Sequence, residues 1–142
     1  MKRVTLFISA VVLFLALGSA TVSAQEPAAD PFIGIWYSID AVDESHQKLS
    51  IQRAWRPGTY WLVSYDDGAS ACGCDPTCPA YAYGLGRAED GVLTARLSVV
   101  CLGRPVRWWG RITMTYTHQA DTDTLVDDTT TSWQRFVCPW AP

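Results

Sequence analysis

The chain has 142 residues, of which 49% are hydrophobic and 18% charged, and its formal net charge at pH 7 is −3. This mild acidity argues against nonspecific binding to nucleic acid. The length suits one domain with its own core.

The N-terminus has the pattern of a secretory signal peptide. Lys2 and Arg3 give a basic start, a nearly unbroken apolar run follows over residues 4–20, and Val22 and Ala24 offer small residues to a signal peptidase. We expect cleavage after Ala24, which removes residues 1–24 and takes the formal net charge from −3 to −5 because two cations leave. The pattern predicts a secreted protein, extracellular or periplasmic, with no membrane attachment after cleavage. An uncleaved anchor is the alternative, since the apolar run approaches the shortest membrane span.

Residues 25–31, QEPAADP, form a short polar arm before the domain, which covers residues 32–142. An arm that threads into an extracellular protein would make this chain an interaction or inhibitor module. A disordered terminus is the alternative.

The remaining chain is typical of an all-β domain. Short runs rich in Val, Ile, Thr, Tyr and Trp alternate with clusters of Asp, Gly and Pro. The turn sequences RPG, DDG, EDG and LGRP place Gly or Pro where chain reversals need special backbone angles. Short connections favour an antiparallel up-and-down β-barrel, and a two-sheet β-sandwich is the alternative. We expect about eight strands, at residues 33–41, 47–54, 59–65, 80–87, 92–100, 106–117, 124–127 and 131–137.

Two short motifs resemble the calycin superfamily of lipocalins, fatty-acid-binding proteins and avidins. GIWY, residues 34–37, opens the first strand, and SWQRF, residues 132–136, lies in the last. The resemblance implies a barrel with Trp36 at its closed floor and Arg135 packed across it. Independently, the first and last strands of a closed barrel are neighbours, and a guanidinium on an indole gains about 0.5 to 2 kcal/mol.

The resemblance carries over the barrel but not a biotin site. Ser38 stands where the avidin pattern has a biotin-contacting Asn. The segment YWLVSYDDGASACG, residues 60–73, also resembles small secreted bacterial proteins of unassigned activity.

The aromatic content points to a cavity. Seven Trp and six Tyr occur, many at alternate positions, so that one set faces the inside of the barrel. An eight-stranded barrel is either filled by side chains or just large enough for one small ligand. Core packing is therefore the alternative for each aromatic residue. We expect a small, partly apolar ligand, with the candidate binding residues Trp36, Leu62, Tyr81, Tyr83, Trp108, Met114 and Tyr116.

An enzyme is the less favoured class. His46 lies in the first hairpin and His118 in a loop at the opposite end, so neither a histidine pair nor a Ser–His–Asp grouping can be assembled. We expect both histidines at the surface, no catalytic residue, no cofactor and no metal.

Eight acidic residues fall in loops at one end of the predicted barrel. Such an acidic rim favours a cation or a basic partner, although Asp is also a common turn residue. The residues are Asp40, Asp43, Glu44, Asp66, Asp67, Asp75, Asp127 and Asp128.

The direction of the strands predicts at which end of the barrel each of the five cysteines lies. Cys72, Cys74 and Cys78 join the third and fourth strands and Cys101 follows the fifth, so these four lie at one end, and Cys138 lies at the other. A disulfide tolerates only about 4.4 to 6.8 Å between Cα atoms. In an oxidising compartment we expect Cys72–Cys101 and Cys74–Cys78 bridges, with Cys138 unpaired or intermolecular. Cys74 or Cys78 is the alternative partner of Cys101, because all three share one loop. Zinc at CGCDPTC is the alternative.

Overall fold

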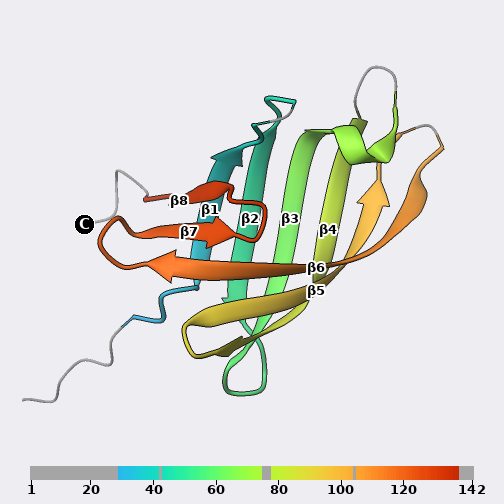
Figure 1. The fold of residues 1–142 in the computed structure, drawn as a ribbon. Helices are drawn as coiled ribbons and strands as arrows, with labels where there is room; N and C mark the ends of the chain where they lie inside the picture. The colour runs from blue at the N-terminus through green and yellow to red at the C-terminus, as the bar shows by residue number, and fades with distance from the viewer. Residues whose placement is uncertain (1–28, 42, 75–77, 104, 138–142) are drawn as a thin grey trace, which may run out of the picture.

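The structure is a computed structural model that describes residues 29–41, 43–74, 78–103 and 105–137. Those residues form an all-β closed barrel of antiparallel strands in chain order, which confirms the predicted fold and excludes the sandwich (Figure 1). The predicted signal peptide and most of the arm lie outside the described residues. The strands are β1 (Gly34–Ile39), β2 (His46–Arg53), β3 (Thr59–Ala69), β4 (Cys78–Glu89), β5 (Val92–Cys101), β6 (Arg107–Gln119), β7 (Thr124–Asp127) and β8 (Ser132–Arg135).

The barrel closes where its first and last strands meet. β1 pairs with β8 through Trp36 opposite Arg135 and Tyr37 opposite Gln134. This seam is short compared with the pairing of β4 with β5, which runs from Ala80–Cys101 to Glu89–Val92. Closure leaves no free edge along the paired part of the sheet, which protects it from edge-to-edge association.

The core follows the two-residue period of the strands. In β5, Leu93, Ala95 and Leu97 are buried whereas Thr94 and Arg96 are exposed. Burying a Leu side chain fully contributes roughly 1.5 to 3 kcal/mol. The main core comprises Phe32, Trp36, Leu49, Ile51, Tyr60, Leu62, Leu93, Ala95, Leu97, Tyr116, Leu125 and Trp133.

Two register shifts interrupt the sheet. One lies between Asp66 and Ala69, where β3 pairs with β4. The other lies between Val99 and Val100 in the pairing of β5 with β6, and it leaves Trp109 without a partner residue. A bulge of this kind re-aims the side chains around it.

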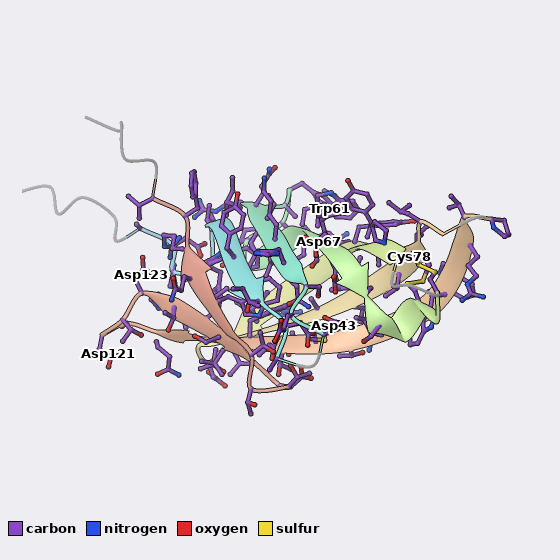
Figure 2. The ribbon with its side chains drawn as sticks, turned by 90° about the horizontal axis from the view of Figure 1, so that it is seen from above. Asp43, Trp61, Asp67, Cys78, Asp121 and Asp123 are labelled. Atoms are coloured by element: carbon purple, nitrogen blue, oxygen red, sulfur yellow. A yellow bond between two sulfur atoms is a disulfide. The ribbon has the colours of Figure 1, made fainter. Side chains whose placement is uncertain are left out.

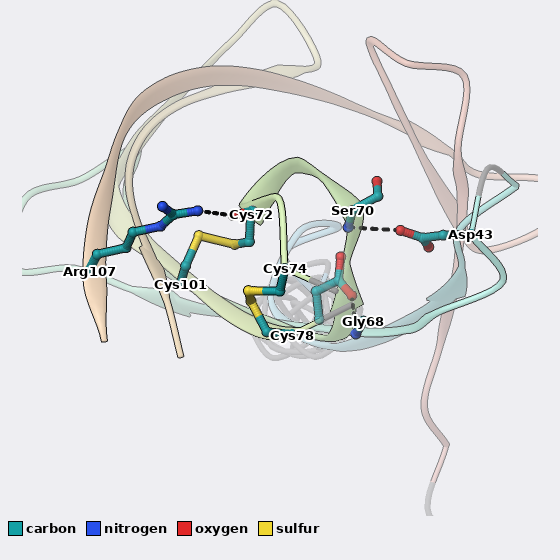
Figure 3. Close-up of a disulfide and its surroundings, with 9 residues drawn as sticks. Asp43, Gly68, Ser70, Cys72, Cys74, Cys78, Cys101 and Arg107 are labelled. Atoms are coloured by element: carbon teal, nitrogen blue, oxygen red, sulfur yellow. Dashed lines mark hydrogen bonds between the residues drawn. A yellow bond between two sulfur atoms is a disulfide. The ribbon is translucent and has the colours of Figure 1, made fainter. Parts of the chain in front are cut away.

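Two disulfides lie at the end of the barrel where β3 and β5 finish, with the predicted pairing (Figure 3). The Cα atoms of Cys72 and Cys101 are 5.7 Å apart, and those of Cys74 and Cys78 are 5.6 Å apart. Arg107 donates a hydrogen bond to the carbonyl of Cys72, which ties β6 to the same loop. The prediction for Cys138 lies outside the described residues. Within the described ranges no helix is long and apolar enough to span a membrane.

Candidate functional site

One end of the barrel is closed by Trp36 and Arg135. Trp36 is fully buried, and its Nε1 donates to the carbonyl of Phe32 over 3.0 Å. The guanidinium carbon of Arg135 lies 4.0 Å from the centroid of the Trp36 ring. Arg135 also donates to the carbonyls of Pro31, over 2.8 Å, and Ile33. The contact implied by the resemblance is therefore present, and we call this end the floor.

The same end holds two further polar contacts. Asp123 accepts hydrogen bonds from Arg135 Nε over 2.7 Å and from Arg135 Nη2 over 3.0 Å. These hydrogen bonds from Arg135 are the larger cause of a lowered pKa of Asp123. The contact with His118 Nε2, at 3.0 Å, lowers this pKa further. His118 packs edge-on against Trp36 and is only 16% exposed, so the expectation of a surface histidine is wrong for this residue. Its place between an indole and a carboxylate explains the burial.

The described end of the N-terminal segment is attached to the floor. Asp30 accepts hydrogen bonds from the Tyr60 hydroxyl over 2.9 Å and from Arg53 over 3.3 Å. Burial and the carboxylate of Asp30 raise the pKa of Tyr60 to about 12. Phe32, which follows, packs edge-on against the Tyr60 ring.

A cavity of about 320 Å³ occupies the opposite end of the barrel interior. Residues from β2 to β8 line it, together with Asp40, which follows β1. Its apolar lining residues are Ala69, Ala71, Ala80, Ala82, Leu97, Val99, Trp109, Ile112, Met114, Tyr116 and Trp133. Its polar lining residues are Asp40, Gln47, Ser64, Asp66, Asp127, Thr129 and Thr131.

The seven candidate binding residues divide into three groups. Met114 and Tyr116 line the cavity. Trp36 and Leu62 are fully buried in the core, outside the cavity lining. The remaining three were expected to line the interior, and this is wrong. They lie on the outer wall, where Tyr81, Tyr83 and Trp108 are exposed by 41%, 44% and 63%.

The small residues of β4 explain why its tyrosines face outwards. A Cβ atom on Gly86 would lie 2.9 Å from methyl groups of Leu62 and Leu93. At Gly86 this face of β4 therefore has no room even for a methyl group, so it is the inward face, and Tyr81 and Tyr83 lie on the outward one. There they lie opposite Tyr65 and Val63 of β3. Figure 2 shows Trp61 of β3 on the outer surface as well.

The bulge in β6 changes which tryptophan of this strand lines the cavity. Trp108, Ile112, Met114 and Tyr116 share one face by simple alternation, so Trp108 was the expected lining residue. The extra residue at Trp109 breaks that alternation, and Trp109 lines the cavity in its place. Trp133 was also missed as a lining residue, although its alternation with Arg135 on β8 places both inside.

Two carboxylates at the cavity share one amide. Gln47 Nε2 donates to Asp40 Oδ2 over 3.1 Å and to Asp66 Oδ2 over 3.2 Å. The backbone N–H of Gly68 donates to Asp66 Oδ1 over 2.9 Å, which fixes Asp66 at the bulge of β3.

A third carboxylate, Asp127, organises the loop between β7 and β8. Its Oδ1 accepts from the backbone and hydroxyl of Thr129 and from the backbone of Thr131. Its Oδ2 accepts from Trp133 Nε1 over 2.9 Å. These donors are neutral, so the buried charge of Asp127 is solvated by hydrogen bonds and not by an ion pair in the described chain.

Two other predicted rim acids, Asp43 and Asp67, accept hydrogen bonds from nearby backbone. Asp43 accepts from the backbone of Ser45 over 3.1 Å and of Ser70 over 2.9 Å, and Asp67 accepts from that of His46 over 2.8 Å. Asp75 lies outside the described residues. Among the residues described, no group of three or more His, Cys, Asp or Glu side chains could hold a metal ion.

No protein-family model, curated protein or solved structure matches this chain.

Proposed function

We propose that this barrel binds a small, partly apolar molecule in the cavity between its strands and the loop that follows β7. The cavity volume of about 320 Å³ is the observation that carries the proposal. Ligand pockets usually begin at about 300 Å³ and combine apolar walls with a few polar groups. A cavity of about 150 Å³ holds benzene, so this one admits a ring with a short side chain.

The closed floor supports a binding role over plain packing. Trp36 and Phe32 are buried at one end of the interior, under the guanidinium of Arg135, whereas Ala69, Ala80 and Ala82 line the cavity at the other end. Small residues at an interior position reduce the apolar area that folding can bury. A bound molecule would cover that surface instead.

We further propose an exported protein of the calycin type. The two disulfides support an oxidising compartment, and the contact of Arg135 with Trp36 supports the calycin relation. The proposed role is non-catalytic. Fractionation of cells that express the full chain tests export, since a mature mass beginning at Gln25 is expected outside the cytoplasm.

Native mass spectrometry of the exported protein tests ligand binding. A retained small molecule is expected, and it should be lost from Ala82→Phe, which fills the cavity. Thr113→Phe is the matched control because Thr113 is exposed on the outside of β6. A wild-type protein that carries no small molecule, and binds none from a panel of apolar compounds, would refute the proposal.

Protein interaction through the N-terminal arm is the second candidate. Asp30 and Pro31 are bound to the floor, so the arm leaves the barrel at the end opposite the cavity. Deletion of residues 25–28 keeps those floor contacts and removes only the rest of the arm. Loss of a protein partner with retention of the small ligand would assign the interaction to the arm.

A further inference from the structure

The charge of the cavity wall is one-sided. Asp40, Asp66 and Asp127 line the cavity, and none of the described lining residues is Lys, Arg or His. Within the described ranges, the donors to Asp66 and Asp127 are amides, one hydroxyl and an indole, all of them neutral. A molecule in the cavity is therefore exposed to a negative potential, which is strong where water is displaced.

The hydroxyl of Tyr116 is an independent sign of a ligand. Tyr116 is 2% exposed and lines the cavity. It makes no hydrogen bond with any of the residues described, and only Ser45 Oγ is fully enclosed there without a partner. The Tyr116 hydroxyl therefore still reaches the cavity space. Buried polar groups rarely stay unpaired, so this one is available to a bound molecule.

The cavity also offers aromatic surface beside these charges. Tyr116 packs edge-on against Trp133, with ring centroids 6.4 Å apart, and the bulge adds Trp109. Aromatic faces attract organic cations in addition to the attraction of carboxylates. Leu97, Ile112 and Met114 supply an apolar wall for the rest of the molecule.

We propose that the ligand is a small organic cation, a protonated amine on an apolar or aromatic body, held by the carboxylates of Asp66 and Asp40 with the Tyr116 hydroxyl as a further hydrogen-bonding partner. This inference rests on the proposed function and names the chemical class of its ligand. An inorganic ion fits less well, because hard cations such as Ca²⁺ need six to eight converging oxygen atoms. The apolar walls have no role in such a site.

Three probes of similar size separate charge from shape. Isothermal titration at pH 7 compares 2-phenylethylamine, which is cationic, with neutral 2-phenylethanol and anionic 3-phenylpropionate. Charge-assisted hydrogen bonds contribute about 1.5 to 3 kcal/mol, so the amine should bind about tenfold more tightly than the alcohol or better. The acid should bind more weakly than the alcohol.

Matched variants assign the effect to the cavity. Asp66→Asn and, separately, Asp40→Asn should lower the affinity for the amine and leave that for the alcohol unchanged. Asp121→Asn removes the same formal charge from an exposed turn beyond β6, far from the disulfide end in Figure 2, and should change neither affinity. Circular dichroism of each variant checks that it is folded.

The outcomes distinguish this inference from the proposed function. If the alcohol or the acid binds as tightly as the amine, or if both Asp→Asn variants keep the preference for the amine, the cationic ligand is refuted while cavity binding stands. If none of the three probes binds and a panel of neutral apolar compounds fails too, cavity binding is refuted and the cationic ligand with it.

Discussion

The guanidinium of Arg135 covers the indole of Trp36, with 4.0 Å between its carbon atom and the ring centroid, and so joins the last strand to the first. Arg135→Ala should lower the free energy of unfolding by about 1 to 3 kcal/mol, since it removes this contact and the hydrogen bonds to the floor. Denaturant unfolding measures the loss. Arg135→Lys keeps the charge but not the planar fork, so an intermediate value is expected. An unchanged midpoint for Arg135→Ala would show that the contact is unimportant.

The position beside this contact, Gly34, has no room for a side chain. Its φ is +152°, and a Cβ atom there would lie 2.7 Å from Arg135 Nη1. Gly34→Ala should therefore destabilise the barrel by roughly 1 to 3 kcal/mol through backbone strain and displacement of Arg135. Gly91→Ala, in the β4–β5 turn with φ +79° and open space around it, is the control for backbone strain alone. Equal losses in both variants would remove Arg135 from the explanation.

The ion pair of Asp123 predicts a dependence of stability on pH. Arg135 and His118 lower the folded-state pKa of Asp123 below that of the unfolded chain, about 3.9. The pair therefore stabilises the fold at neutral pH, and this contribution disappears as the pH falls through the folded-state pKa.

Asp123→Asn tests this dependence because Asn tolerates the positive φ of 48° at this position. Thermal unfolding should show the variant less stable than wild type at pH 7, with the difference shrinking below about pH 4. A difference that stays constant down to pH 2 would contradict the assignment.

Tyr116→Phe should leave the fold as stable as wild type or slightly more stable. The hydroxyl reaches the cavity but makes no hydrogen bond in the described part of the chain, so its removal breaks no contact there and keeps the ring contact with Trp133. Thermal unfolding of the ligand-free protein provides the measurement. A loss above about 1 kcal/mol would mean that the hydroxyl has a structural partner.

The two disulfides should differ in how much each contributes to the free energy of unfolding. Cys72–Cys101 spans 29 residues and Cys74–Cys78 spans 4. In the chain-entropy model the first stabilises by roughly 3 to 4 kcal/mol and the second by about 2. Paired Cys→Ala variants, unfolded in denaturant, provide the comparison, and non-reducing peptide mapping checks the connectivity. A link from Cys138 to one of these four cysteines would contradict it.

The strand order, and the end of the barrel that carries Cys72, Cys74, Cys78 and Cys101, could be predicted from the sequence, because both depend on local signals; the choice of Cys72 as the partner of Cys101 could not. Alternating residues and Gly- or Pro-containing turns mark each strand, and short connections force neighbours in sequence to be neighbours in space. Strand direction then determines which loops share an end. The contact of Arg135 with Trp36 follows from the same closure of first strand on last.

Only the tertiary structure decided which residues line the cavity. Alternation divides β4 into two faces, one with Tyr81 and Tyr83 and the other with Ala82 and Gly86. Either face is apolar enough to lie in the interior. The space beside Leu62 and Leu93 selects the small set, and no pattern within β4 carries that information. A one-residue bulge against β5 likewise substitutes Trp109 for Trp108, because register depends on the partner strand. Asp40, Gln47 and Asp66 meet through register as well: the pairing of β2 with β3 sets Gln47 opposite Asp66, and the pairing of β1 with β2 brings Asp40, just after β1, beside Gln47.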